Sequence, residues 1–195
     1  MYERGEPRDP VSVQYAPGMD LDVAARQHGC LHRDQIQGPV ADGWTEIRPN
    51  VWLCPALETR WTFEASALLS IDPTAFGPNP RSVLSHISAT HLYGVGVLTG
   101  AYHLTSNSVT SSDPQIVVHT VEHLPDWSYV EGIPTTNPAQ TAADIAATCD
   151  ADHAGRVIND MLHRGHVTRH DLDERLGASV VDELLTQHYA NAVRH

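Results

Sequence analysis

The hydrophobic and polar positions near the N-terminus predict two short helical segments followed by a hairpin. Residues 1–18 show little periodicity and contain several Gly and Pro residues, which predicts a flexible arm. Asp20 can cap a helix in LDVAARQHG, and HRDQI is typical of a second helical turn. In GWTEIRPNVWLCP, apolar and polar residues alternate on both sides of Pro49-Asn50, which predicts two strands joined by a turn. Helix, helix and hairpin is the order of a winged-helix module, which we place at residues 19–58.

The pattern of residues 59–195 predicts a mixed domain in which helices surround a small sheet. Helices are predicted at 59–72 and at 81–95, where Leu84, Ile87 and His91 recur at helical spacing. The predicted strands are Tyr102–Thr105, Gln115–Val121, Trp127–Val130 and Ile133–Thr136. The predicted C-terminal helices are 137–150, 152–165, 170–177 and 178–193. We therefore expect an α+β fold, with a winged-helix-like N-terminal module followed by a domain with a small sheet and C-terminal helices.

Charge and hydropathy limit the function classes. The chain of 195 residues has a formal net charge of -12, and all 12 of its basic residues are arginine. Such a chain is poorly suited to bind a polyanion, because phosphate contacts supply most of non-specific nucleic-acid affinity. There is no run of 18 apolar residues, and MYERGEPRDP lacks the apolar core of a secretory signal. We therefore expect a cytoplasmic protein with no membrane partner, whose odd set of cysteines (Cys30, Cys54 and Cys149) is reduced.

Histidine is abundant, with 13 residues, but its spacing does not predict a metal site. His163, His166 and His170 recur at i, i+3 and i+7, yet Gly165 interrupts the helix that would align them. His119 and His123 lie in and after a predicted strand, so they share no helical face. We therefore expect no metal and no cofactor.

The sequence also offers no pattern typical of catalysis. Ser85 and His86 are adjacent, and adjacent residues on a helix point about 100° apart, so they would not face each other as nucleophile and base. Asp144 and Asp160 lie on successive predicted helices without a third metal-ligand pattern. Neither a Gly-x-Ser-x-Gly elbow nor a phosphate-binding Gly-x-x-x-x-Gly-Lys loop is present. We expect a protein that binds rather than an enzyme.

Three segments together resemble one family. VLSHISATHLYGV (83–95) is similar to its Ser-His-x-Ser-Ala segment, and VEGIPTTNPAQTAADIA (130–146) to its Gly-Ile-Pro-x-Thr-x-Pro-x-x-Thr segment. INDMLHRGHVTRHDL (158–172) is similar to its helix-Gly-Val-Thr segment. They occur in the order and at about the spacing of the AbiEi-type antitoxins of type IV toxin–antitoxin (abortive infection) systems. The motif positions, to which the resemblance assigns structural roles, are Ser85, His86, Gly94, Gly132, Pro134, Pro138, Thr141 and Gly165.

This resemblance implies a transcriptional regulator with a DNA-binding winged helix, a second domain that supports antitoxin action, and a nucleotidyltransferase-like toxin encoded nearby. Operator DNA would be contacted by Arg33, Gln35, Gln37 and Arg48. The chain departs from the family at QGPVAD (37–42), which stands where relatives have a longer, basic recognition helix, and at Gln140, where relatives commonly have Arg. Two alternatives stay open: a DNA-binding repressor without a toxin partner, and a degenerate enzyme-like or orphan protein.

Overall fold

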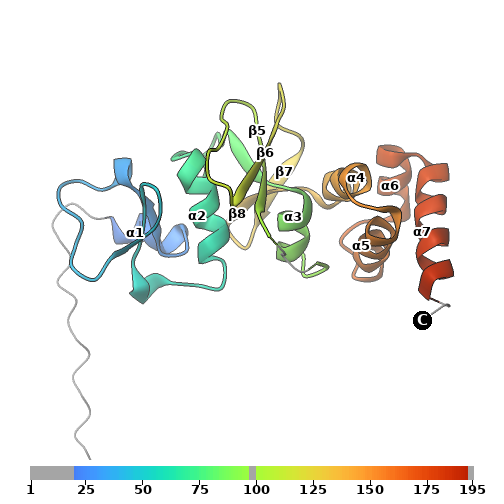
Figure 1. The fold of residues 1–195 in the computed structure, drawn as a ribbon, viewed down its shortest axis with the longest axis horizontal. Coiled ribbons are helices and arrows are strands. Elements are labelled where there is room, and N and C mark those ends of the chain that lie inside the picture. The colour runs from blue at the N-terminus through green and yellow to red at the C-terminus, as the bar shows by residue number, and fades with distance from the viewer. Residues whose placement is uncertain (1–19, 97–99, 193–195) are drawn as a thin grey trace, which may run out of the picture.

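The computed structural model describes residues 20–96 and 100–192. The predicted flexible arm at 1–18 lies outside the described residues. The elements form three parts in a row, with an N-terminal module at one end, a mixed sheet in the middle and a group of helices at the other end (Figure 1).

The N-terminal module contains one short helix and a three-stranded sheet. Asp20 caps α1 as predicted, because its carboxylate accepts hydrogen bonds from two backbone amides of the first turn. The predicted hairpin is present as β2 and β3, and an unpredicted strand, β1, pairs with β3 in the order β1-β3-β2. The elements are α1 (Leu21–Arg26), β1 (Cys30–His32), the 3-10 turn η1 (Arg33–Gln35), β2 (Thr45–Arg48), β3 (Val51–Leu53) and the 3-10 turn η2 (Pro55–Leu57). Residues 36–44 contain no helix.

This module shares a hydrophobic cluster with the next helix, α2 (Thr62–Ile71). Cys30, Val51 and Leu53 from the small sheet pack against Leu69 of α2, and all four are buried. Burial of apolar surface between the two parts stabilises their contact, so removing the module would expose one side of α2.

The central sheet has the strand order β6-β5-β4-β8-β7. Its strands are β4 (Ser82–Leu84), β5 (Tyr102–Ser106), β6 (Ile116–Thr120), β7 (Trp127–Val130) and β8 (Ile133–Thr136). The four strands predicted between 102 and 136 are confirmed with small shifts in their bounds. Helix α2 and helix α3 (His86–Leu92) flank the strands on opposite sides (Figure 1). Leu84, Leu104 and Ile133 fill the core between α2 and the sheet.

The single helix predicted over 81–95 is wrong. Residues 82–84 form β4, which pairs antiparallel with β5 and parallel with β8, and the helix begins only at His86. Two apolar residues in a row, Val83 and Leu84, are compatible with a strand buried on both faces, and both are fully buried. Helical periodicity does not distinguish such a strand from the helix that follows it.

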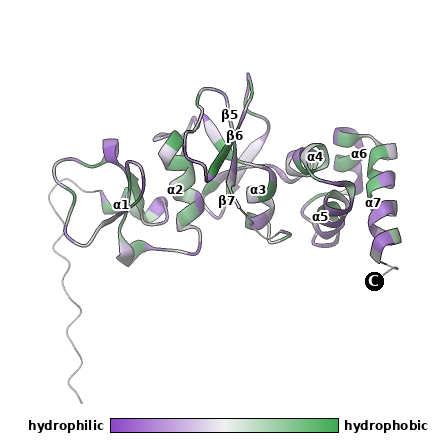
Figure 2. Ribbon diagram, viewed as in Figure 1, coloured by the Kyte–Doolittle hydropathy of each residue, from purple (hydrophilic) through white to green (hydrophobic). Residues whose placement is uncertain are grey.

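Four helices close the chain: α4 (Pro138–Thr148), α5 (Ala151–His163), α6 (Arg169–Leu176) and α7 (Ala178–Ala192). Asn137 caps α4 and Thr168 caps α6, as the sequence predicts. Their shared core contains Ile145, Ile158 and Met161, and the hydropathy of α5 and α7 alternates around each helix (Figure 2). The mixed α+β character of the fold is thus confirmed. Within the described residues, no helix combines the length and the apolar character that crossing a membrane requires.

Candidate functional site

An unusual backbone conformation lies at the end of β4. Ser85 is extended, with φ -146° and ψ 177°, and its amide donates to the carbonyl of His103 as a continuation of the strand pairing. His86 then adopts a φ of +52°, in the left-handed region that non-glycine residues occupy only rarely. This conformation costs on the order of 1 kcal/mol or more and occurs often at functional sites. It turns the chain from the strand into α3 within a single residue.

Strand pairing brings two further histidines beside His86. In the parallel pairing of β5 with β6, His103 lies opposite Val117 and Thr105 lies opposite His119. Side chains two residues apart on a strand point to the same face, so His103 and His119 share one face of the sheet. Ser88 of α3 fixes β5 here, because its hydroxyl accepts a hydrogen bond from the amide of His103 at 2.8 Å.

The three imidazoles form a compact group. The ring of His86 stacks on that of His119 with centroids 3.6 Å apart and an angle of 12° between the rings. His103 Nδ1 lies 3.0 Å from His119 Nε2, within hydrogen-bonding distance. One ring nitrogen from each of the three residues lies within 4.8 Å of the other two, and no other set of three metal-ligating side chains in residues 20–96 and 100–192 is as close.

Burial keeps this histidine cluster (His86, His103 and His119) uncharged near neutral pH. Desolvation, together with the neighbouring His119 and His103, lowers the pKa of His86 to about 3. Desolvation also lowers the pKa of His103 and that of His119. A neutral imidazole keeps one lone pair, with which it can accept a hydrogen bond or bind a metal ion.

A carboxylate on α4 completes the surroundings of His86. Asp144 Oδ2 lies 3.8 Å from His86 Nδ1 and has no hydrogen-bond partner in the protein, although it is buried. The other oxygen, Oδ1, accepts a hydrogen bond from the Gln140 amide. Burial raises the pKa of Asp144, because a desolvated carboxylate favours its neutral form. Gln140, noted as a departure from the family pattern, therefore contacts the carboxylate of this site.

Ser85 and His86 do contact each other, contrary to the expectation from helix geometry. Ser85 precedes the helix, and its Oγ lies 2.9 Å from His86 Nδ1. Asp144 approaches the same nitrogen. In a catalytic triad the serine and the acid must bind opposite ring nitrogens, so that the imidazole can transfer a proton between substrate and nucleophile. Ser85 is also fully buried, so this arrangement is not that of a serine hydrolase.

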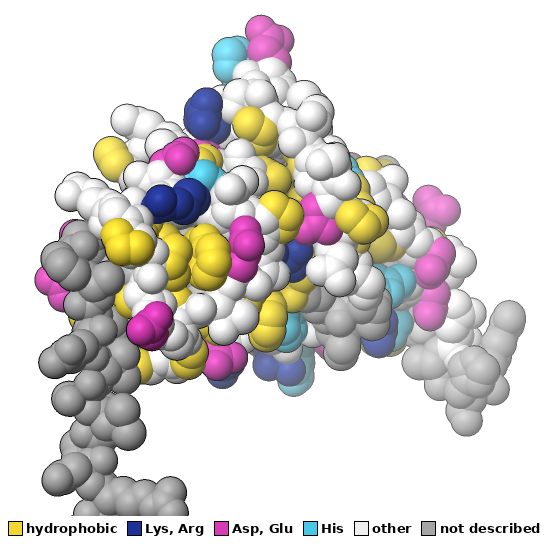
Figure 3. All heavy atoms as spheres, turned by 60° about the vertical axis from the view of Figure 1, so that its left-hand side comes forward, with side chains coloured by type: hydrophobic (Ala, Val, Ile, Leu, Met, Phe, Trp, Pro, Cys, Tyr) yellow, Lys and Arg dark blue, Asp and Glu magenta, His cyan; other side chains and the backbone are white. Residues whose placement is uncertain are grey.

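The predicted DNA contacts in η1 do not lie on a helix long enough to enter a groove. The guanidinium of Arg33 donates to the carbonyl of Ile36 at 2.9 Å. The Gln35 side chain accepts from the amide of His32 and donates to the carbonyl of Pro73. Gln37 is exposed in the loop that follows. On the face shown in Figure 3, hydrophobic and acidic side chains separate the arginine side chains of the described residues, which form no continuous basic stripe on that face.

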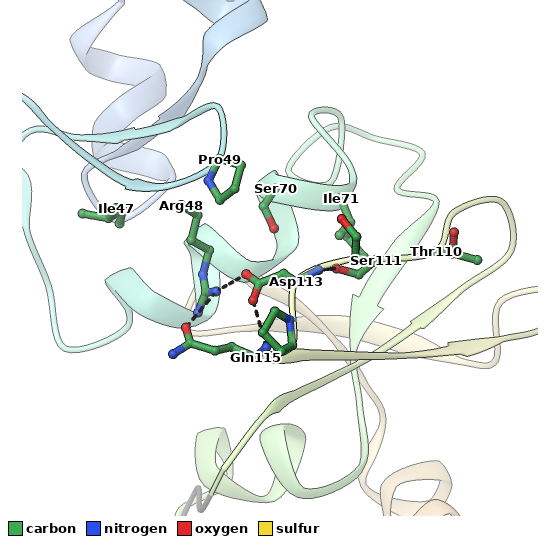
Figure 4. A pocket seen from close by; sticks show the side chains of 11 residues that line it. Ile47, Arg48, Pro49, Ser70, Ile71, Thr110, Ser111, Asp113 and Gln115 are labelled. Atoms are coloured by element: carbon green, nitrogen blue, oxygen red, sulfur yellow. Dashed lines mark hydrogen bonds and ion pairs between the residues drawn. The ribbon is translucent and has the colours of Figure 1, made fainter.

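Arg48 is part of the protein interior. It is only 7% exposed, and its guanidinium donates to Asp113 Oδ2 at 2.8 Å and to Ser66 Oγ at 3.0 Å. Arg48 and Asp113 line a cavity of about 470 Å³ between the N-terminal module, α2 and the loop before β6 (Figure 4). In this conformation Arg48 joins the two parts of the protein, and its charge is neutralised by Asp113 instead of facing a phosphate.

Most glycine and proline positions of the resemblance have backbone roles. Gly94 and Gly165 have positive φ values at the ends of α3 and α5. Glu131 and Gly132, with φ of +51° and +82°, form the tight turn predicted between β7 and β8. Pro134 lies in β8 opposite Tyr129, and Pro138 occupies the first position of α4.

Side chains from the three resembling segments contact one another. Tyr93 donates from its hydroxyl to the carbonyl of Thr136 at 2.8 Å, and its ring lies 5.4 Å from that of His166. Thr136 and Thr141 are joined through their hydroxyls at 2.8 Å. Segments separated by tens of residues therefore form one junction between the sheet and the C-terminal helices.

Local sequence patterns do not predict the histidine cluster, because its three side chains come together only through the order and register of the strands. His103 and His119 each lie in a strand that the sequence predicts. A histidine in each of two predicted strands was the only sign in the sequence that the two could lie close together. Only the register of β5 with β6 shows that the two share a face. The histidine triplet that the sequence did suggest, at 163, 166 and 170, is separated by Gly165, and His170 pairs instead with Glu174.

Comparison of the chain with protein-family models gave no match, and comparison with curated proteins gave none.

Proposed function

We propose that this chain is an antitoxin-like regulatory protein of the AbiEi type, which counteracts a nucleotidyltransferase-like toxin by binding and not by catalysis. The observation that carries the proposal is the junction of the three segments that resemble this family. Val83–Val95, Val130–Ala146 and Ile158–Leu172 are far apart in sequence, but they share one set of contacts. A chance resemblance of three unrelated segments would not be expected to select residues that pack together.

The packing of this junction extends into the core of the helical part. Val95 from the first segment contacts a cluster that includes Ile145 from the second and Met161 from the third, all buried. Leu84 of β4 also pairs with Thr135 of β8 in the central sheet. The segments thus support one another, as expected for motifs that specify a single folded domain.

The charge of the chain favours a protein partner over DNA. With a formal net charge of -12, the chain repels a polyanion at long range and attracts a basic surface. A protein that handles nucleotides needs such a basic surface to bind phosphate groups. Of the four predicted DNA contacts, Arg48 is buried in an ion pair, and Gln35 is held by backbone groups of the protein itself.

Growth rescue tests the proposal. The full-length chain is expressed from a constitutive promoter together with the protein encoded beside it, and colony formation is counted when that neighbour is induced. The full chain is needed, because Cys30, Val51 and Leu53 pack on α2 and a truncation at residue 58 would expose that helix. The proposal predicts that the neighbour alone stops growth and that the chain restores it. A harmless neighbour, or a toxic one that the chain does not counteract, would refute it.

The alternative function, a repressor that binds operator DNA, can be tested with the same protein. A repressor that contacts DNA through Arg33 and Gln37 would bind its own upstream region with an affinity that falls steeply as salt increases. Band-shift titrations at two salt concentrations measure this slope. A steep slope and nanomolar affinity, together with failure to rescue growth, would favour the repressor.

A further inference from the structure

We propose that His86, His103 and His119 bind a divalent transition-metal ion, Zn²⁺, through one ring nitrogen each. This inference goes beyond the proposed antitoxin function and replaces the expectation of no metal site. It rests on the arrangement of the three side chains, which come from the β4–α3 turn, from β5 and from β6.

The distances fit a zinc site after small side-chain movements. Two imidazole nitrogens that each lie about 2.0–2.1 Å from a tetrahedral zinc ion are about 3.3 Å apart. His103 Nδ1 and His119 Nε2 are 3.0 Å apart, so a cation can replace the hydrogen that one shares with the other. One nitrogen of His86 lies within 4.8 Å of a nitrogen of each of the other two histidines, and the ring of His86 must tilt out of its stack on His119 to complete the set.

The backbone holds the three residues in place before a metal arrives. His103 and His119 are fixed by the β5–β6 ladder, in which His103 pairs with Val117 and His119 pairs with Thr105. The amide of Ser85 is bonded to the carbonyl of His103, which joins the β4–α3 turn to β5 at the site. Only side-chain torsions remain to be adjusted, so little backbone ordering opposes metal binding.

Ser85 and Asp144 supply the outer contacts that zinc-binding histidines usually have. A histidine that binds zinc through one nitrogen donates its other N–H to a carboxylate or another acceptor. His86 Nδ1 faces Ser85 Oγ at 2.9 Å and Asp144 Oδ2 at 3.8 Å, which leaves Nε2 as the metal ligand. Asp144 Oδ2 has no hydrogen-bond partner in the protein, so a His86 N–H that turns toward it when zinc binds would satisfy a buried acceptor.

Three neutral nitrogens and one free coordination position are typical of zinc sites that bind water or a substrate. Imidazole ligands suit Zn²⁺ and neighbouring first-row ions and are poor ligands for Mg²⁺ or Ca²⁺. Magnesium therefore serves as a negative control ion.

The test measures zinc bound to the full-length protein. Protein freed of metal with a chelator is titrated with zinc chloride in competition with a chromogenic chelator, and bound zinc is counted by mass spectrometry after gel filtration. We expect one zinc ion per chain for the wild type and at least a hundredfold weaker binding for His103→Asn and for His119→Asn. His123→Asn is the matched control, because His123 is 88% exposed and lies outside the cluster. It should bind zinc as the wild type does.

If Asp144 positions His86, its substitution should weaken zinc binding less than substitution of a zinc ligand does. Asp144→Asn should bind zinc about 10–100-fold more weakly while still binding one ion, since outer-shell substitutions in zinc sites have effects of this size. Cobalt chloride added to the wild type should give the intense visible absorption of a four-coordinate site. Circular dichroism checks that each variant is folded.

Three outcomes would overturn the proposal: substoichiometric zinc in the wild type, unchanged binding in a folded His103→Asn variant, or an equal loss in His123→Asn. If His103→Asn and His119→Asn do not fold, a measurement on the wild-type protein still tests the proposal. Zinc should protect His86, His103 and His119 from modification by diethyl pyrocarbonate, mapped by peptide mass spectrometry. Equal modification with and without zinc would refute the site. Growth rescue is a separate assay, so either proposal can fail without the other.

Discussion

Lowering the pH from 7 to 5 should destabilise the protein through His86. In the folded protein the pKa of His86 is about 3, against 6.5 for a free imidazole. Between these two values the unfolded chain binds a proton that the folded chain does not, so the free energy of unfolding falls as pH falls through this window. The contribution of His86 is fully present above pH 6.5 and is lost progressively below it.

The magnitude follows from the unfolded state alone, because His86 stays neutral in the folded protein at both pH values. At pH 5, about 1.5 pH units below its ordinary pKa, protonation stabilises the unfolded chain by about 2 kcal/mol, against about 0.2 kcal/mol at pH 7. His86 should therefore reduce the free energy of unfolding by about 2 kcal/mol over this range. His103 and His119 act in the same direction, and Asp144, whose pKa is raised, acts in the opposite direction.

His86→Asn isolates the contribution of His86, because asparagine tolerates the positive φ at this position and does not titrate. Urea unfolding followed by tryptophan fluorescence at pH 7 and pH 5 gives the free energy of unfolding of both proteins. We expect the wild type to lose about 2 kcal/mol more than the variant. Equal losses would refute the assignment of a buried, neutral histidine at the end of β4.

Three further substitutions test the packing. Arg48→Met should reduce the free energy of unfolding by about 3 kcal/mol, because it leaves Asp113 without its cation; an unchanged melting temperature would contradict the buried ion pair. Gly155→Ala should cost about 1–3 kcal/mol, since a Cβ there would meet the backbone oxygen of Leu184 between α5 and α7; wild-type stability in thermal unfolding would show that these helices lie farther apart. Asn137→Ala should cost about 1 kcal/mol through loss of the α4 cap, and no change in urea unfolding would argue against the cap.

The local signals in the sequence predicted many of the elements. Caps at Asp20, Asn137 and Thr168, and the turn at Glu131-Gly132, depend on residues close in sequence, and the structure has all of them. Strand β1 was missed because three residues between a helix and a turn carry little periodic signal. The helix expected over 81–95 was wrong because its first residues are buried on both faces of the sheet.

Local sequence patterns did not predict the backbone conformation and the strand pairing that form the histidine cluster. The helical assignment of Ser85 and His86 placed their side chains apart, whereas the extended Ser85 and the left-handed His86 bring them into contact. The pairing of His103 with His119 depends on β5 and β6 being parallel neighbours, which their sequences do not specify. Arg48 was expected at a DNA surface, but its partner Asp113 lies 65 residues away in sequence.

We propose that the chain acts as an antitoxin through protein contact and does not need its N-terminal module to touch DNA. Growth rescue by a triple variant, Arg26→Ala, Arg33→Ala and Gln37→Ala, tests it most directly, because these side chains are exposed on the module. Expressed from a constitutive promoter beside the neighbouring toxin, the wild type and the triple variant should restore colony formation equally. Failure of the wild type to rescue, or loss of rescue in a folded triple variant, would contradict the account.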